Sequence, residues 1–344
     1  MLFKVAVKCF TYNHASFIKD ALDGFCIQET DFPYVCIIID DASTDGEQEV
    51  IGQYLSEHFS LEDEVTGKEE TEDYLLTFAR HKTNLNCFFA VLFLKYNHYN
   101  KKSKAPYYQQ WTNHVPYLAL CEGDDYWTDP SKLQKQVDFL EKHQDYVICS
   151  HDFINFIEER KAFASRSSYA AIKRVQGERK YLEYSLDNYF ERWWTHPLTC
   201  VYRNGSYLDR IPSQQYKNYR DDVYFYYVLK EGKGALLYDI MGVYRIHGHG
   251  EWSTMDSLQK NKLIFMNALD IYRIEGDERA ITKMESAQFY LVTVLFNSHC
   301  FGKAFKEVLR FWKSVPPKYF FAFMAKLRVW FFNKIKRHLG FQEV

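Results

Sequence analysis

Three polar segments follow short apolar runs, and their side chains could bind a charged ligand. They are Thr11-Tyr12-Asn13-His14, the acidic turn 40–46, and Glu122-Gly123-Asp124-Asp125. In a doubly wound parallel sheet, ligands bind at the carboxyl ends of the strands, so these segments are functional candidates. No GxGxxG sequence and no P-loop follows the first run, which argues against dehydrogenases and P-loop NTPases.

The acidic segments each allow two interpretations. Glu122, Asp124 and Asp125 repel one another at short range unless a cation holds them, and Mg²⁺ or Mn²⁺ would suit such carboxylates together with substrate phosphates. The alternative is a solvated turn before a helix that Asp129 caps. In the turn 40–46, Asp41 either accepts hydrogen bonds from a base or belongs to an ordinary turn that caps the next helix.

The elements that would position these residues alternate between strands and helices. Because the strands are short and continuously apolar, we expect an α/β fold with a mostly parallel sheet and helices on both faces. Segments 61–73 and 101–114 are expected to be loops, and the spacing is helical from Met255 onward. The expected strands are 3–9, 34–40, 75–79, 117–121 and 146–149, and the expected helices include 15–28, 86–96 and one that starts at Pro130.

Composition narrows the function classes. The chain of 344 residues has a formal net charge of −2, which is not the footprint of a nucleic-acid-binding protein. No apolar run is long enough for a spanning helix, and the N-terminus lacks the pattern of a signal peptide. Eight scattered cysteines without CxxC pairs are typical of reduced core residues. We therefore expect a cytoplasmic protein.

The three segments, in their order and spacing, resemble the signature blocks of family 2 inverting glycosyltransferases. The similarity covers about residues 3–250 and includes Glu122 through Val137. It implies a GT-A fold, a nucleotide-diphospho-sugar donor and Mn²⁺ or Mg²⁺. The implied transferase domain is 1–250, with a donor part in 1–127 and an acceptor and base part in 128–250, followed by a helical region, 251–344.

The resemblance also implies roles for single residues. Asp41 would read the base, usually uracil, and Asp222 would be the general base, with helix capping as the alternative for Asp222. The implied donor-binding residues are Thr11, Tyr12, Asn13, Asp41, Asp124 and Arg245, and the implied metal ligands are Asp125 first, with Asp124 and His247. Aromatic rings stack well on sugars, so Trp127, Trp193 and Trp194 are acceptor candidates, with core packing as their alternative. Asp221, beside the proposed general base, is a further acceptor candidate.

The C-terminal segment has a different charge from the rest of the chain. Residues 308–342 contain eight Lys and Arg and no acidic residue. An apolar stripe at helical spacing, as in an interfacial helix on anionic lipid, is formed by Phe320, Phe323, Met324, Leu327, Trp330 and Phe331. A helix packed on its own domain or on a partner is the alternative.

The sequence thus predicts metal-assisted inverting transfer of a sugar, usually from a UDP-sugar, to a hydroxyl of a glycan or lipid-linked acceptor. Surface-polysaccharide synthesis, on or near the cytoplasmic face of the membrane, would be the setting. Two other functions stay open: a nucleotidyltransferase that makes sugar nucleotides, and a non-catalytic nucleotide-sugar-binding or membrane scaffold protein. Segments 61–73 and 101–114 depart from the family pattern, so no donor-sugar contacts are implied there.

Overall fold

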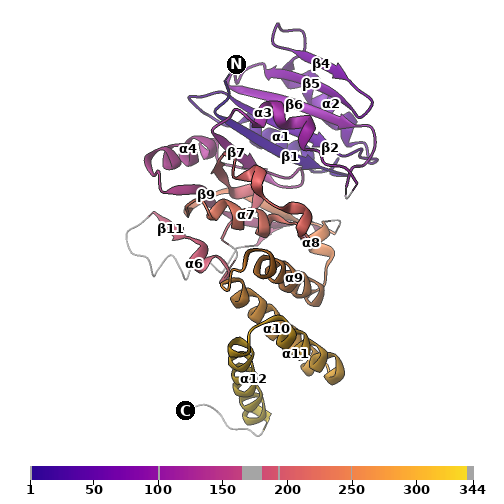
Figure 1. The fold of residues 1–344 in the computed structure, drawn as a ribbon. Coiled ribbons are helices and arrows are strands. Elements are labelled where there is room, and N and C mark those ends of the chain that lie inside the picture. Colours follow the sequence, from indigo (N-terminus) through magenta and orange to yellow (C-terminus); the bar gives the residue numbers. More distant parts are fainter. Residues whose placement is uncertain (1, 100, 165–179, 193, 249, 339–344) are drawn as a thin grey trace. The chain divides into compact units, whose positions relative to one another are not determined.

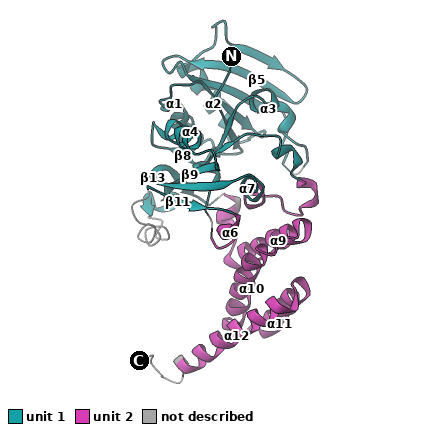
Figure 2. Cartoon of the chain, turned by 60° about the vertical axis from the view of Figure 1, so that its left-hand side comes forward, with its two compact units in different colours: residues 1–185, 193–211, 225–248 teal, residues 186–192, 212–224, 249–344 magenta. Residues whose placement is uncertain are grey.

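The structure is a computed structural model that describes residues 2–99, 101–164, 180–192, 194–248 and 250–338 (Figure 1). The chain divides into two compact units (Figure 2). The first unit consists of residues 1–185, 193–211 and 225–248, and the second of 186–192, 212–224 and 249–344. The expected α/β architecture, with parallel strands at the centre of the sheet and a helical C-terminal region, is confirmed.

Four parallel strands form the centre of the sheet in the first unit. In spatial order they are β7 (Tyr117–Leu120), β1 (Val5–Thr11), β2 (Tyr34–Asp40) and β6 (Cys87–Leu94). Every residue of β2 is buried, as expected for a strand that is covered on both faces. Because Thr11 pairs with Asp40, the carboxyl ends of β1 and β2 lie side by side.

Further strands extend the sheet on both sides. Beyond β6 lie β5 (Tyr74–His81) and then β3 (Phe59–Ser60), and β4 (Gly67–Glu70) also pairs with β5. Beyond β7 lie, in order, β12 (Val201–Arg203), β9 (Tyr146–Ile157), β13 (Lys233–Ile246) and β11 (Tyr181–Tyr184). Two short strands complete the sheet: β8 (Tyr126–Trp127) pairs with β13, and β10 (Ala162–Ala164) pairs with β9. The pairing of Val243 with Tyr126 places the end of β13 beside the segment 122–125.

The helices of the first unit follow the strand ends. They are α1 (Ile18–Cys26), α2 (Glu47–His58), α3 (Ala105–Thr112) and α4 (Lys132–Lys142), while α7 (Asp221–Leu229) begins in the second unit and ends in the first. Helix α1 buries Ile18, Leu22 and Phe25, which follow a helical spacing. Short 3₁₀ turns occupy Glu158–Arg160, Pro197–Thr199, Leu208–Arg210 and Ser213–Gln215.

The second unit is helical. It contains α6 (Leu186–Tyr189), α8 (Glu251–Thr254), α9 (Ser257–Glu275), α10 (Ala280–Asn297), α11 (Phe301–Ser314) and α12 (Pro317–His338). Helix α9 begins at a capping box formed by Asp256 and Gln259, and it ends at Gly276 in the left-handed conformation. Within the described ranges, no helix has the length and apolar character that crossing a membrane requires.

Three expected elements differ in the structure. Residues 87–94 form strand β6 where a helix was expected, because a short run that is apolar on both sides fits a buried strand as well as a helix. The expected loop 101–114 contains α3, and the expected loop 61–73 contains β4, which pairs with the edge strand β5.

Candidate functional site

His14, Asp124 and His247 come together in the first unit as a group that could hold a metal ion. One ligand atom from each residue lies within 4.8 Å of the other two. His247 Nε2 is 2.9 Å from Asp124 Oδ2, and His14 Nε2 is 3.9 Å from the same oxygen. Asp124 Oδ1 is buried and has no hydrogen-bond partner among the described residues. An unpaired buried carboxylate oxygen beside two imidazoles fits a cation site.

Burial and the two histidines act on the pKa of Asp124 in opposite directions. Burial is the largest single influence and raises the pKa. The hydrogen bond from His247 and the nearby imidazoles together lower it by more, so the net pKa lies below its ordinary value. Burial lowers the pKa of His14, against an opposing effect of Asp124. Asp124 therefore remains a carboxylate at neutral pH, while His14 is neutral, and these are the forms that bind a metal.

Hydrogen bonds that Glu47 accepts set the orientation of His14. The Thr11 hydroxyl donates to Glu47, so the Thr11 oxygen can accept from His14 Nδ1, 3.1 Å away. Nδ1 then carries the proton, and Nε2 presents a lone pair toward Asp124. Glu47 also accepts from the backbone N–H of His14 (2.8 Å) and from the Ser43 hydroxyl (2.9 Å). One buried carboxylate thus joins the ends of β1 and β2.

Gly123 allows the segment 122–125 to approach β1. A Cβ atom at Gly123 would lie 2.1 Å from Thr11 Oγ1 and 2.7 Å from Thr11 Cβ, which real side chains do not tolerate. The backbone N–H of Gly123 donates to the carbonyl of Phe10 at 3.2 Å. The residue type at 123 therefore determines whether Asp124 can reach His14.

Asp125 and Arg245 fix this segment to the end of β13. Asp125 is buried, and its Oδ1 accepts from the backbone N–H of Arg245 at 2.8 Å. Burial, together with the charge of Asp124, raises the pKa of Asp125 well above its ordinary value. The Arg245 guanidinium pairs with Glu158 (2.8 Å) and Asp20, and its Nε donates to the Asp124 carbonyl at 3.0 Å.

These contacts differ from the sequence-based roles of Asp125 and Arg245. The group of potential ligands contains Asp124, whereas Asp125, expected as the first ligand, is bound to backbone. Arg245 is a buried residue near the end of β13, and two protein carboxylates pair with its guanidinium. It is placed to position Asp124.

The other donor-binding candidates lie at the ends of β1 and β2. Tyr12 is 44% exposed. Asn13, with a φ of 57°, accepts from the backbone N–H of Thr44 at 2.8 Å and so connects the two strand ends. Asp41 is buried; it accepts from the backbone N–H of His98 at 2.7 Å and forms an ion pair with Lys104 at 2.7 Å. Lys104 belongs to the segment that departs from the family pattern.

Asp222 lies in the second unit at the start of α7, next to the exposed Asp221. Its Oδ1 accepts from the backbone N–H of Val223, and Asn267 Nδ2 lies 3.0 and 3.2 Å from its two carboxylate oxygens. Desolvation raises the pKa of Asp222 above its ordinary value, although the hydrogen bond from Asn267 and the charge of Lys283 act in the opposite direction. A carboxylate with a raised pKa is a stronger base than an ordinary aspartate.

The tryptophans do not form an acceptor platform among the described residues. Trp127 is 1% exposed, donates to the Leu198 carbonyl and lies 3.8 Å from the Lys132 ammonium. Trp194 is 5% exposed and stacks on Tyr184. Both therefore serve core packing, the alternative that the sequence had left open. Trp193 lies outside the described residues.

Several residues of the site had no assigned role in the sequence analysis. His14 stands directly after the first polar triplet, so its position at a strand end could have identified it. Glu47, Lys104 and Asn267 carry no sequence signal, because their partners are 36, 63 and 45 residues away in the chain.

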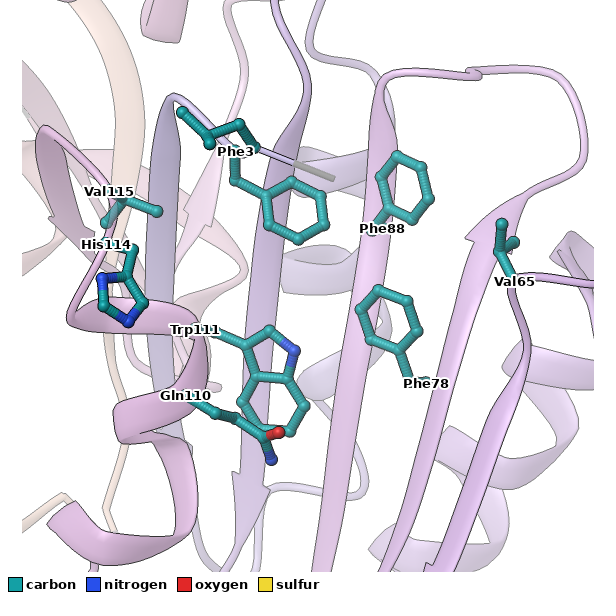
Figure 3. A pocket seen from close by; sticks show the side chains of 9 residues that line it. Phe3, Val65, Phe78, Phe88, Gln110, Trp111, His114 and Val115 are labelled. Carbon is teal, nitrogen blue, oxygen red and sulfur yellow. The ribbon is translucent and has the colours of Figure 1, made fainter.

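A hollow of about 510 Å³ lies elsewhere in the first unit (Figure 3). Its wall is mainly aromatic and includes Phe3, Phe78, Phe88 and Trp111. Phe3 comes just before β1 and Phe88 is the second residue of β6, so the hollow lies at the amino ends of these strands. The candidate metal site is at the carboxyl ends and is therefore separate from it.

Comparison with known proteins finds solved structures of the same fold. No family model matches the chain. TarS of S. aureus (residues 1–349), in complex with UDP-GlcNAc, has a TM-score of 0.58 at 16% identity and covers 92% of this chain and 82% of its own. The mannosyltransferase PcManGT of Pyrobaculum calidifontis, in complex with GDP-Man and Mn²⁺, has a TM-score of 0.51 at 14% identity. The match covers 98% of this chain and 83% of the mannosyltransferase chain. The chain shares the fold of these proteins.

Sequence relatives come from mycobacteria. The uncharacterized proteins Rv1520 of Mycobacterium tuberculosis and Mb1547 of Mycobacterium bovis are each 32% identical to this chain over 250 residues. The match covers 72% of this chain but only 60% of the length of the relatives.

A glycine substitution tests the close approach at Gly123. We expect Gly123→Ala to lower the free energy of unfolding by about 2 kcal/mol or more, because the added Cβ overlaps Thr11. Gly52→Ala is the matched control: no atom lies within 4 Å of its added Cβ, and in the interior of α2 it should raise stability by about 0.5–1 kcal/mol. Equal stability of Gly123→Ala and the wild type in urea unfolding would contradict the packing described here.

Proposed function

We propose that this chain is an inverting glycosyltransferase that transfers a sugar from a nucleotide-diphospho-sugar, with UDP as the favoured nucleotide, to a hydroxyl of a glycan or lipid-linked acceptor. The observation that carries the proposal is the group His14, Asp124 and His247 at the carboxyl ends of the central strands. Two proteins of the same fold support it, since one has a structure in complex with UDP-GlcNAc and the other a structure in complex with GDP-Man and Mn²⁺.

We assign the metal site to His14, Asp124 and His247 in place of Asp125. The unpaired oxygen of Asp124 and the lone pair of His14 Nε2 support the assignment. Two imidazoles favour a transition metal such as Mn²⁺ over Mg²⁺, which takes oxygen ligands. When bound, the ion would supply a Lewis acid for the departing diphosphate. Arg245 and Glu47 act as positioning residues, because they orient Asp124 and His14.

The transfer requires a base for the acceptor hydroxyl, and we assign this role to Asp222. The acceptor oxygen loses its proton to Asp222 as it attacks the anomeric carbon, and the bond from that carbon to the diphosphate breaks on the opposite face. Asp222 must be ionised for this step, so activity rises with pH through its pKa. Because that pKa is raised, we expect the acid limb of the pH profile above the range of an ordinary aspartate.

The donor nucleoside is proposed to bind where β1 and β2 end. Tyr12 offers an exposed ring, and Thr11, Asn13 and Asp41 surround the strand ends. Base recognition by Asp41 would compete with its ion pair to Lys104. The eight cysteines are all free, which fits the reducing cytoplasm as the proposed location. Surface-polysaccharide synthesis is the proposed setting.

A panel of nucleotide sugars tests the function. We expect one or a few UDP-sugars to be hydrolysed slowly by the protein with Mn²⁺, and the released sugar to have the inverted anomeric configuration in an early NMR spectrum. A retained configuration would contradict the inverting mechanism, and no hydrolysis or binding of any nucleotide sugar would contradict the proposed function.

Calorimetric titration with Mn²⁺ tests the metal assignment. Asp124→Asn should weaken Mn²⁺ binding at least tenfold, because it removes the only carboxylate of the ligand group. Asp125→Asn is the control, since this side chain bonds to backbone. Chelation by EDTA should abolish donor hydrolysis, and Mn²⁺ should restore it better than Mg²⁺. Equal loss of Mn²⁺ binding in Asp124→Asn and Asp125→Asn would contradict the assignment and indicate that Asp125 is also a metal ligand.

Substitution of Asp222 tests the general base. Asp222→Asn should lower kcat by about 10²- to 10⁴-fold and leave donor affinity unchanged, because the amide keeps an oxygen that Asn267 can contact but accepts no proton. Asp209→Asn, at an exposed aspartate of the first unit, should retain full activity. A parallel loss of donor affinity in Asp222→Asn would indicate a structural role.

A pH profile tests how Asn267 tunes this base. Asn267→Ala removes a hydrogen bond that lowers the pKa of Asp222, so the acid limb of kcat should move to higher pH, while kcat on the alkaline plateau changes little. Asn261→Ala on the same helix, α9, leaves Asp222 untouched and should keep the wild-type profile. If the acid limb of the kcat profile does not move in Asn267→Ala, the ionisation of Asp222 does not determine that limb.

A further inference from the structure

Helix α11 has one apolar face whose large side chains are about half exposed. Phe301, Phe305 and Trp312 follow a helical spacing along this face, and they are 52%, 63% and 54% exposed. The adjacent side of the helix is buried through Ala304 and Phe311. The helix is therefore anchored on that side and leaves three large aromatic rings about half exposed.

Helix α12 exposes a second apolar stripe. Its buried anchor is Phe323, which contacts Phe311 of α11. The stripe expected from the sequence is therefore divided: Phe323 packs inward, whereas Met324 and Phe331 are exposed. Together with Phe321, Phe332 and Ile335 they form an exposed line, in which each side chain is 39–69% exposed.

Aromatic contacts join the two stripes into one surface. At one end, Phe296 of α10 contacts both Phe301 and Phe331, with ring centroids 4.9 and 5.6 Å apart. At the other end, Trp312 stacks on Phe320 at 5.8 Å. Both helices follow α10 in the second unit (Figure 2). We call the exposed residues of these two stripes the α11–α12 face.

The charge of these helices is almost entirely positive. Residues 301–338 contain ten Lys and Arg and a single acidic residue, Glu307, which is buried and paired with Arg310. Lys306 and Lys313 are exposed beside the aromatic stripe of α11, and Lys303 is exposed on the other side of the same helix. Arg328 is exposed within the stripe of α12, 5.6 Å from the ring of Phe332.

We propose that the α11–α12 face binds the surface of a membrane that contains anionic phospholipids. Aromatic and aliphatic side chains would enter the headgroup boundary, and the flanking Lys and Arg would contact the phosphates. A second copy of this chain fits less well, because a symmetric interface would bring two sets of positive charges together.

This inference stands on the second unit alone and does not depend on the proposed transferase activity. Together with that activity, it would place the protein where lipid-linked acceptors are found.

Vesicle sedimentation with the full chain tests the proposal. The protein should bind vesicles with about 30% phosphatidylglycerol at least tenfold more tightly than pure phosphatidylcholine vesicles, and raised salt should weaken the binding. Phe305→Ser/Phe332→Ser and Lys303→Glu/Lys306→Glu/Lys313→Glu should each lose about tenfold or more. Because these side chains are exposed, both variants should keep the wild-type melting temperature. Leu75→Ser/Leu85→Ser, at exposed leucines of the first unit, is the matched control and should bind normally.

Light scattering without lipid separates the membrane from a protein partner. Equal binding to both vesicle types, or unchanged binding of the two α11–α12 variants, would overturn the proposal. A wild-type oligomer that Phe305→Ser/Phe332→Ser converts to a monomer would also overturn it, since the face would then be an interface between copies.

Discussion

The carboxylate of Asp124 is the feature on which the rest of the site depends. It is largely buried, and its Oδ1 is removed from solvent, where an unpaired negative charge is costly. His247 Nε2 lies 2.9 Å and His14 Nε2 3.9 Å from one of its oxygens, and the other oxygen has no hydrogen-bond partner among the described residues. A cation completes such an arrangement better than any contact that the described chain provides.

The surrounding structure brings Asp124 and its partners to one point. Gly123 allows the close approach to β1, Glu47 fixes the proton on His14 Nδ1 through Thr11, and Arg245 holds the Asp124 carbonyl. Each of these contacts joins segments that are far apart in the sequence. The site can therefore form only after the parallel sheet has aligned its strand ends, so fold and function share the same packing constraints.

Sequence reasoning recovered the fold better than the details of the site. Continuous apolar runs identified β1, β2 and β7, and the polar residues after them located the site. The run 87–94 was misinterpreted because an eight-residue apolar segment has no periodicity that separates strand from helix. Neighbouring carboxylates look alike in sequence, so the backbone contact of Asp125 and the position of Asp124 beside two imidazoles are visible only in the structure. Asn267 could not be found, since its contact to Asp222 depends on how α9 packs.

Pulsed EPR of the protein with Mn²⁺ tests the central claim most directly. If His14, Asp124 and His247 hold the ion, the spectrum should show nitrogen couplings from two imidazoles, and His247→Gln should remove one of them. Addition of UDP should then introduce a phosphorus coupling. A bound Mn²⁺ without nitrogen couplings, or one that UDP leaves unchanged, would contradict the site as described.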